Sequence, residues 1–166
     1  MKQIALSTTG KKYKGLYSAM VDDENYDLVK DLTWSVMMDN NTQYAYTQMI
    51  VNGVRKPVKM HRFILGVTDP KIKVDHGDSN GLNNQKHNLR TCTHQQNMGN
   101  QNKRKNCSSK YKGVRHKKQL NIWEAYICSR GEYKHLGYFK TEIEAAKEYD
   151  KAAIESYGEF AKLNLK

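Results

Sequence analysis

Hydrophobic and polar residues alternate with two different periods along this chain, and the changes between the periods mark its expected elements. In the first third, period-two segments predict strands at residues 16–21, 34–38, 44–51 and 54–60, with short helices at 22–32 and 60–66. The dipeptide Asn52-Gly53 lies between two of these strands and favours a tight hairpin turn. This part indicates a small α+β lead-in without an evident catalytic cluster, although Arg55, Lys56 and Lys59 give the hairpin a capacity for DNA contact.

Further along the chain, two groups of predicted strands are each followed by a helix. Residues 73–76 and 88–92 predict two strands around a polar turn at 77–84, and Thr93 is a good N-cap for a helix over 94–100. Later segments predict strands at 112–116, 123–129 and 134–139, then a helix that starts at Thr141 and ends at Gly158. The fold class is therefore α+β, with a strand–loop–strand–helix unit before three strands and a final helix.

Charge indicates the kind of partner. The 166 residues carry a net charge of +11, and their mean hydropathy is −0.87. Residues 1–57 have 7 basic and 6 acidic side chains, residues 58–100 have 6 and 3, and residues 101–166 have 15 and 8. A positive region in one part of the chain favours a polyanion, and counterion release makes nucleic acid the natural one. A basic surface that only keeps the protein in solution is the alternative.

The cysteines and the apolar segments bear on location. Cys92, Cys107 and Cys128 are odd in number and form no CxxC pair, which argues against a disulfide framework and for a reducing compartment. The first 15 residues contain no apolar leader, and no stretch reaches the length of a membrane span. We therefore expect a cytoplasmic protein that has no membrane partner.

Residues 74–97 combine a carboxylate, an imidazole and several carboxamides with turn-forming residues. Phosphodiester hydrolysis needs an activated water, which a near-neutral imidazole such as His76 can supply. It also needs a charge sink and help for the leaving oxygen, which one divalent ion supplies. Asp75 and Asn97 offer the oxygen ligands that Mg²⁺ prefers. Because neighbours on a strand point to opposite faces, Asp75 and His76 share a site only if the chain bends near Gly77.

Two other interpretations of this stretch stay open. The polar residues can simply build a turn, as Asn88 does if it bonds backbone groups across the loop. A zinc site would need His76, His87, Cys92 and His94, which lack the usual spacing and the paired cysteines. His61, in the short apolar helix before this stretch, has the character of a structural histidine.

The segment from about residue 60 to residue 101 resembles an HNH endonuclease, in the variant whose last metal-ligand histidine is replaced by asparagine. The resemblance rests on Asp75-His76, Asn84, Asn88-Leu89-Arg90, Thr93 and Asn97. It implies a ββα-metal core in which Asp75 and Asn97 are metal ligands and His76 is the general base. It also implies that Asn88 is the central structural asparagine, and we place Arg90 with His76 and Asn88 in the catalytic group. The turn departs from the family's pattern, because Gly77-Asp78-Ser79 stands where the family usually has Ile-Asn-Gly.

Residues 109–164 resemble an Apetala-two (ethylene-response-factor-like) DNA-binding domain. The resemblance is carried by Tyr111-Lys112-Gly113-Val114-Arg115, Trp123-Glu124-Ala125-Tyr126-Ile127, His135-Leu136-Gly137-Tyr138-Phe139 and Tyr149-Asp150-Lys151-Ala152-Ala153. It implies three antiparallel strands backed by one helix, with the sheet entering the major groove of DNA. Strand alternation then directs Arg115 toward a guanine, which it can contact bidentately. The other residues that we expect to contact DNA are Lys112, Lys117, Tyr126, Tyr133 and His135 on or near the sheet, and Lys103, Arg104 and Lys105 in a backbone-tracking linker.

Together these patterns predict four parts: a lead-in at 1–57, an HNH core at 58–100, a basic linker at 101–109 and a DNA-binding domain at 110–166. The predicted function is that of a homing-type endonuclease, as in phages and mobile elements. It would use Mg²⁺ or another divalent cation to hydrolyse double-stranded DNA to 5′-phosphate and 3′-hydroxyl ends. No small-molecule substrate is expected, and the sequence gives neither the oligomeric state nor the recognition site. The alternative is a non-catalytic DNA-binding regulator that retains a degenerate nuclease scaffold.

Overall fold

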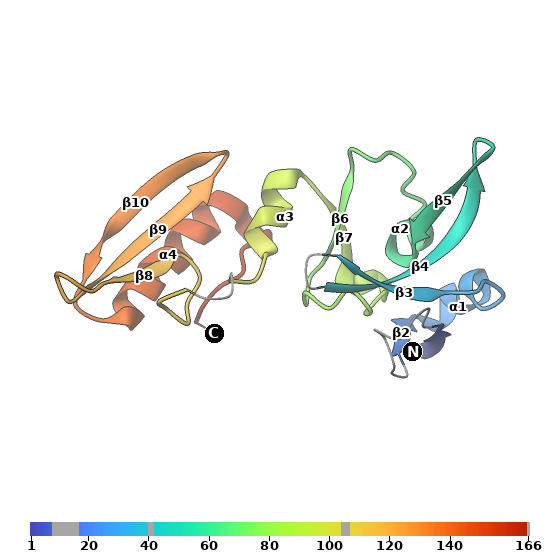
Figure 1. Ribbon diagram of the computed structural model, residues 1–166, viewed down its shortest axis with the longest axis horizontal. Coiled ribbons are helices and arrows are strands. Elements are labelled where there is room, and N and C mark those ends of the chain that lie inside the picture. The colour runs from blue at the N-terminus through green and yellow to red at the C-terminus, as the bar shows by residue number, and fades with distance from the viewer. Residues whose placement is uncertain (8–16, 40–41, 104–106, 166) are drawn as a thin grey trace. The chain divides into compact units, whose positions relative to one another are not determined.

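The computed structural model describes residues 1–7, 17–39, 42–103 and 107–165 (Figure 1). They form two compact units, residues 1–91 and residues 92–166, each with its own hydrophobic core. The predicted DNA-contacting residues Arg104 and Lys105 lie outside the described residues.

The first unit is built from small sheets and short helices. Its elements are β1 (Lys2–Leu6), β2 (Tyr17–Val21), α1 (Asp23–Val29), β3 (Ser35–Asp39), β4 (Thr42–Val51), β5 (Val54–Lys59), α2 (Met60–Ile64), β6 (Lys73–His76), the 3-10 turn η2 (Lys86–Asn88) and β7 (Leu89–Cys92). The antiparallel pairs are β1–β2, β3–β4 and β4–β5, and β6 pairs with β7 in a sheet of two strands.

Trp34 lies at the centre of this unit's core and is 1% exposed. Its ring meets Phe63 of α2 edge-on, with centroids 5.9 Å apart, and its Nε1 donates to the carbonyl of Val29 at 2.9 Å. A buried indole needs such a partner for its N–H. Because β1, β3 and α2 all contribute to this core, it joins the predicted lead-in to the start of the predicted nuclease segment.

The loop between β6 and β7 is held in place by β2. The N–H of Met20 donates to the carbonyl of Leu82 at 2.9 Å, and Asn84 N–H donates to the carbonyl of Met20 at 2.8 Å. Gly81 lies so close to β4 that an added Cβ would come 2.3 Å from the carbonyl oxygen of Gln43 and 2.8 Å from the ring of Tyr44. A larger residue at position 81 would therefore push the loop away from the unit's core.

A carboxylate at the start of α1 makes a second attachment to this loop. Asp22 accepts hydrogen bonds from the backbone N–H of Lys86 at 2.6 Å and from Nε2 of Gln85 at 3.1 Å. The bond from Lys86 is the main reason why the pKa of Asp22 is lowered. Asp22 thus connects the loop to the N-terminal segment, and its side chain makes no capping bond to α1.

The second unit is a three-stranded antiparallel sheet packed on a helix. Its elements are α3 (His94–Asn100), β8 (Val114–Lys117), β9 (Ile122–Ser129), β10 (Glu132–Phe139), α4 (Glu142–Tyr157) and the 3-10 turn η3 (Gly158–Phe160), and the sheet order is β10-β9-β8. The side chains that fill the space between sheet and helix include Val114, Ala125, Ile127 and Leu136, as alternation predicts. Small residues of α4, among them Ala146 and Ala153, are fully buried there.

Helix α3 packs on α4 and η3 within this unit. Gly99 lies against Tyr157, so that an added Cβ would come 2.6 Å from Cγ of that ring. The N–H of Lys162 donates to the carbonyl of Gly99 at 3.2 Å, which attaches the end of α3 to the C-terminal segment. The predicted nuclease segment 58–100 is thus divided between the two units, and its role as one functional domain stays a prediction.

Both predicted helix caps are confirmed. Thr93 Oγ1 accepts from the N–H of Gln96, and Gln96 Oε1 accepts from the N–H of Thr93. Thr141 and Glu144 form the same capping box at α4. Strand β1 and the 3-10 turns η2 and η3 were not predicted, and the predicted helix at 22–32 ends at Val29. Among the described residues, no helix combines the length and apolar character needed to cross a membrane.

Candidate active site and nucleic-acid interface

Asp75 and His76 are adjacent on β6, and both are buried, with 7% and 4% exposure. The strand ends at His76, and Gly77 begins the loop by donating its N–H to the carbonyl of Asn88 at 2.9 Å. The principal neighbour of Asp75 is Arg90 on β7, whereas His76 packs against aromatic rings. The two side chains therefore have different immediate partners, as alternation along a strand requires. The charge of Asp75 nevertheless acts to raise the pKa of His76, so the two groups are within electrostatic reach of each other.

Arg90 holds the carboxylate of Asp75. Its Nε and Nη2 atoms both donate to Oδ2 of Asp75 at 3.0 Å. The Asp75 side chain is 8% exposed and that of Arg90 is 26% exposed, so water screens this ion pair only in part. The pair fixes the orientation of a predicted metal ligand, and it also occupies one oxygen of that ligand.

His76 lies in an aromatic environment. Its ring centroid is 5.7 Å from that of Tyr44 and 4.9 Å from that of His61, and the two imidazoles are perpendicular. Burial lowers the pKa of His76, although a hydrogen bond with Asn84 opposes this effect. The imidazole is consequently neutral at neutral pH, which is the protonation state that a general base needs.

His61 was interpreted from the sequence as a structural histidine, yet the structure places it against the predicted base. It is 5% exposed, and burial lowers its pKa to about 2. No described residue makes a hydrogen bond to its Nδ1 atom. His61 lies 15 positions before His76, and no local sequence pattern links the two histidines. Only the packing of α2 beside β4 and β6 brings their rings together.

The loop after His76 is organised around Asp78 and Asn88. Asn88 Nδ2 donates to Oδ1 of Asp78 at 3.0 Å and to the carbonyl of Asn83 at 2.8 Å, while Asn88 Oδ1 accepts from the N–H of Asp78 at 2.9 Å. Asp78 Oδ2 also accepts from Asn83 Nδ2 at 2.8 Å. The predicted bracing function of Asn88 is confirmed, and Asp78 in the altered turn is part of the same brace.

The residues of this region fit a divalent ion that has few protein ligands. Asp75 is a hard oxygen donor of the kind that Mg²⁺ takes, with substrate phosphate and water completing the shell. Within the described ranges, no three His, Cys, Asp or Glu side chains cluster as a metal site would require. The zinc alternative from His76, His87, Cys92 and His94 therefore gains no support. Asn97 lies on α3 in the second unit, and its role as a ligand stays a prediction.

On the second unit, the predicted DNA-contacting side chains of the sheet surround one carboxylate, that of Glu124. Its side chain is 3% exposed although it lies on the face opposite α4. It accepts from Arg115 Nε at 2.7 Å and Nη2 at 2.9 Å, from Tyr133 Oη at 2.6 Å and from Lys117 Nζ at 3.0 Å. His135 Nδ1 lies 3.1 Å from the same carboxylate. These bonds, the one from Arg115 above all, hold the pKa of Glu124 well below its usual range.

The hydrogen bonds around Glu124 use some of the N–H donors of Arg115. Its Nη2 atom also donates to Tyr133 Oη at 3.0 Å, and its guanidinium lies 5.1 Å from the ring centre of Tyr126 and 5.8 Å from that of Tyr133. The two tyrosine rings stack at 5.4 Å. Nε and Nη2 are bonded to Glu124, and Nη2 is bonded to Tyr133 as well. The bidentate guanine contact expected of Arg115, through Nη1 and Nη2, therefore requires the bond to Tyr133 to open, while Glu124 keeps the guanidinium oriented.

Lys112 makes a structural contact, and its predicted contact with DNA stays a prediction. Its Nζ donates to the carbonyl of Gly99 at 2.6 Å and to that of Met98 at 3.3 Å, so it caps the C-terminal end of α3. Burial, with a smaller effect of Lys162, lowers the pKa of Lys112 to about 8.

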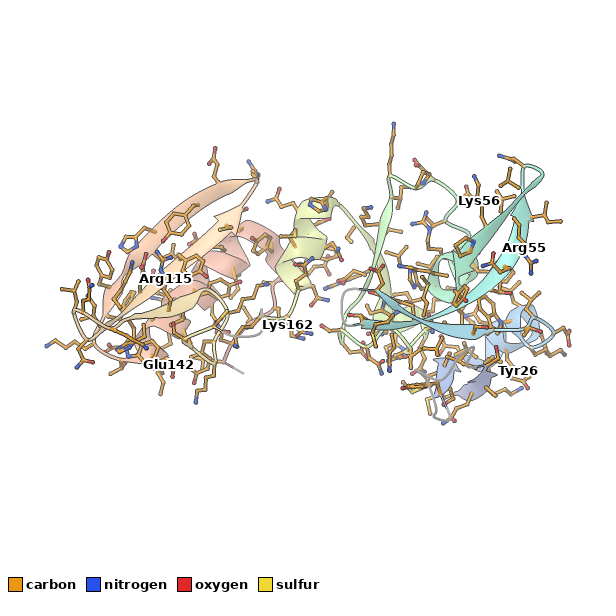
Figure 2. The ribbon with its side chains drawn as sticks, in the orientation of Figure 1. Tyr26, Arg55, Lys56, Arg115, Glu142 and Lys162 are labelled. Carbon is orange, nitrogen blue, oxygen red and sulfur yellow. The ribbon has the colours of Figure 1, made fainter. Side chains whose placement is uncertain are left out.

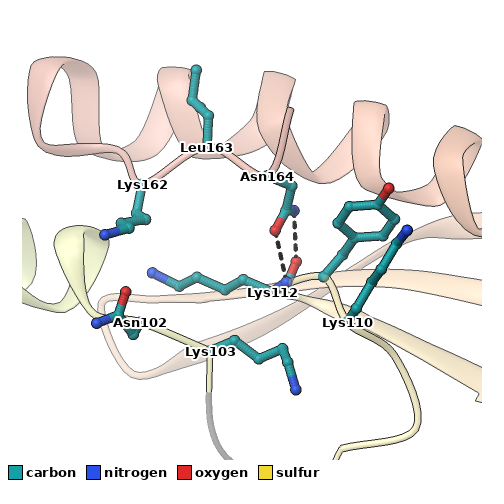
Figure 3. Close-up of a pocket in the computed structure, with 8 residues that line it drawn as sticks. Asn102, Lys103, Lys110, Lys112, Lys162, Leu163 and Asn164 are labelled. Carbon is teal, nitrogen blue, oxygen red and sulfur yellow. Dashed lines mark hydrogen bonds between the residues drawn. The ribbon is translucent and has the colours of Figure 1, made fainter. Parts of the chain in front are cut away.

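Lys112 also lines a cavity of about 360 Å³ within the second unit (Figure 3). Three further lysines line it, Lys103, Lys110 and Lys162, and the lining contains no acidic residue. The linker residue Lys103 therefore lies beside other cations, as a phosphate-contacting segment would.

Two comparisons with known proteins bear on these sites. Over 112 residues, the chain is 40% identical to an uncharacterized HNH endonuclease of Acanthamoeba polyphaga mimivirus. The chain is a homologue of that viral protein. The match covers 64% of the chain but only 57% of the viral protein, so the chain spans little more than half of its relative. The relation indicates a nuclease family without establishing an activity.

The plant similarity is confined to one part of the chain. Over 58 residues, 35% of the chain, it is 40% identical to an APETALA2-like protein of rice and 39% identical to an AP2-like ethylene-responsive transcription factor of Arabidopsis thaliana. The match spans 13% and 12% of these plant proteins. No protein-family model and no solved structure matches the chain.

Proposed function

We propose that this protein is a metal-dependent DNA endonuclease. The observation that carries the proposal is the neutral, buried imidazole of His76 directly after an arginine-held carboxylate, Asp75, in a homologue of an HNH endonuclease. The homing-type assignment and the cytoplasmic location are parts of the proposal that rest on the sequence alone.

His76 takes a proton from the attacking water in this proposal. Its low pKa keeps the accepting nitrogen unprotonated, and the rings of Tyr44 and His61 restrict its rotation. Asn88 and Asp78 hold the loop that follows, so that the imidazole keeps its position relative to the substrate. The products are a 5′-phosphate and a 3′-hydroxyl end.

A bound divalent ion would neutralise charge on the phosphoryl group and assist the leaving 3′ oxygen. Asp75 is the proposed ligand on the first unit, and Asn97 is the proposed ligand on α3. Arg90 orients Asp75 through two hydrogen bonds to Oδ2 of the carboxylate.

The second unit is proposed to hold double-stranded DNA through the sheet face around Glu124. Similarity to the plant APETALA2-like proteins supports this assignment, as do the cations Arg115 and Lys117 on that face. The lysine-lined cavity adds sites for backbone phosphates, which position a protein on DNA without reading its sequence.

Incubation of supercoiled plasmid with the protein tests the proposal. Cleavage is expected with Mg²⁺ and not with EDTA. His76→Ala should lower the rate by about 10²–10⁴-fold, the usual contribution of a general base, while DNA affinity is retained. His87→Ala is the matched control, because His87 is exposed and lies near the same loop. Equal Mg²⁺-dependent cleavage by wild type and His76→Ala would refute the assignment.

One observation favours the rival function, a DNA-binding regulator without catalytic activity. Arg90 neutralises Asp75 and competes with a cation for its carboxylate. If the wild-type protein binds DNA with high affinity but leaves plasmid intact with Mg²⁺ and with Mn²⁺, the regulator is the correct interpretation.

A further inference from the structure

The β4–β5 hairpin of the first unit has an exposed apolar tip. The tip consists of Ile50, Val51 and Val54, which are 78%, 39% and 55% exposed. The strands continue past the unit's core, and Figure 1 shows the hairpin projecting from the rest of the unit. Exposed branched aliphatic side chains grouped at one point of a surface indicate a contact with another molecule.

The turn holds these side chains in a fixed arrangement. Asn52 and Gly53 have φ angles of 53° and 76°, the two positive values of a tight hairpin turn. Val51 pairs directly with Val54, and Ile50 pairs with Arg55. Both faces of the hairpin therefore carry an aliphatic side chain at the tip. Because the turn already fixes the backbone there, binding of a partner costs little conformational entropy.

Two basic residues follow the apolar tip directly on β5. Arg55 and Lys56 are exposed on β5 (Figure 2), and among the described residues neither side chain forms an ion pair or a hydrogen bond. Lys59, further down the strand, is already paired with Asp39 at 2.8 Å. From residue 40 to residue 68 the sequence contains no acidic residue. The hairpin thus presents apolar groups in front of uncompensated positive charge.

We propose that this hairpin inserts into the minor groove of DNA and bends it. Ile50 and Val54 wedge against a base-pair step and partly unstack it, while Arg55 and Lys56 bind the flanking phosphates. This combination of an apolar wedge with basic side chains is how minor-groove proteins kink a duplex. The inference rests on the DNA partner of the proposed function and adds a second contact, on the first unit.

Charge argues against other occupants of the tip. In a symmetric dimer through this hairpin, Arg55 and Lys56 of each copy would approach the same two cations of the other copy, which is unfavourable. A purely apolar partner would leave both cations desolvated and unpaired. DNA supplies the apolar base faces and the anionic phosphates together.

Bending is measured with the full-length protein in EDTA, so that cleavage does not interfere. A duplex with donor and acceptor dyes at its ends reports the end-to-end distance by energy transfer. Wild type should raise the transfer efficiency, and Ile50→Ala/Val54→Ala should lose at least half of that rise while the salt dependence of binding is unchanged. Arg55→Gln/Lys56→Gln should instead reduce the slope of log affinity against log salt by about 1.8, roughly 0.9 per lost phosphate contact.

Leu28→Ala and Ile72→Ala are the matched controls, because both residues are exposed aliphatics of the same unit, at 49% and 42%. Both variants should bend DNA as wild type does. Equal bending by wild type and the double-alanine variant would overturn this inference and leave the proposed function standing. Absence of any DNA binding by wild type would overturn both. A wild-type dimer that becomes monomeric in the double-alanine variant would assign the tip to self-association and overturn the wedge.

Discussion

His61 shows how one side chain can change the properties of a site without belonging to its sequence motif. It is buried, its ring is perpendicular to that of His76 at 4.9 Å, and its pKa of about 2 keeps it uncharged under all ordinary conditions. A second cation beside His76 would oppose protonation of the base. A neutral His61 therefore lets His76 accept a proton in the proposed reaction.

Burial of His61 also makes stability depend on pH. Because the folded-state pKa is lower than the ordinary value of 6.5, the unfolded chain binds more protons below that pH, and stability falls as the pH drops. Wild type should lose free energy of unfolding between pH 7.5 and pH 5.5, and His61→Phe should lose less over that interval. Urea unfolding at both pH values measures this. A variant with the same pH dependence as wild type would show that His61 is not the titrating group.

At the scale of elements, the sheet face of the second unit combines a buried anion with the cations that we propose to contact DNA. Glu124 lies directly opposite Arg115 in the register of β8 and β9, and Tyr133 reaches the same carboxylate from β10. This pairing fixes the guanidinium before DNA arrives, which favours selectivity over affinity. It also removes one positive charge from the surface that meets phosphates.

Glu124→Gln should therefore raise non-specific affinity and lower selectivity. Loss of the charge frees Arg115, and loss of one oriented base contact costs discrimination of ~1–3 kcal/mol, which is roughly 5- to 150-fold. Competition binding with a site selected from random sequence, against calf thymus DNA, gives both quantities. Glu132→Gln on β10 makes the same change of charge without touching Arg115, and it should raise affinity with little change in selectivity. If the two variants changed affinity and selectivity equally, Glu124 would act only through its charge and not by orienting Arg115.

Elements were easier to predict from the sequence than contacts. Thr93 and Thr141 mark helix starts through local bonds, and Asn52-Gly53 marks a turn, so these positions follow from neighbours in the chain. By contrast, β1 exists because it pairs with β2, and the Arg115–Glu124 bond depends on strand register. Interactions between residues far apart in the chain leave no local pattern, and for this reason the partners of His76 and Arg115 had to come from the structure.

At the scale of the whole molecule, charge is carried by both units. Residues 1–91 hold 13 basic and 9 acidic side chains, and residues 92–166 hold 15 and 8. The excess of +7 on the smaller second unit agrees with its proposed role in holding DNA. The +4 of the first unit includes the cations of the β4–β5 hairpin.

The attachment of α3 predicts where the second unit can be cut. A fragment of residues 92–166 should unfold cooperatively, because it retains Gly99 against Tyr157 and the bonds from Lys112 and Lys162 to α3. A fragment of residues 101–166 exposes that surface and should melt at a lower temperature. Thermal unfolding followed by circular dichroism compares the two. Equal melting temperatures would mean that α3 adds nothing to this unit.

The same attachment has a consequence for recombination between related genes. The basic run that starts at residue 101 is the obvious crossover point in the sequence. A crossover there would nevertheless separate α3 from Tyr157, Lys112 and Lys162, which contact it. A functional hybrid should instead join near residues 91 and 92. Asn97 would then be inherited together with the sheet that we propose to bind DNA, so that a nuclease acquiring a new specificity would receive part of its proposed catalytic apparatus from the same donor.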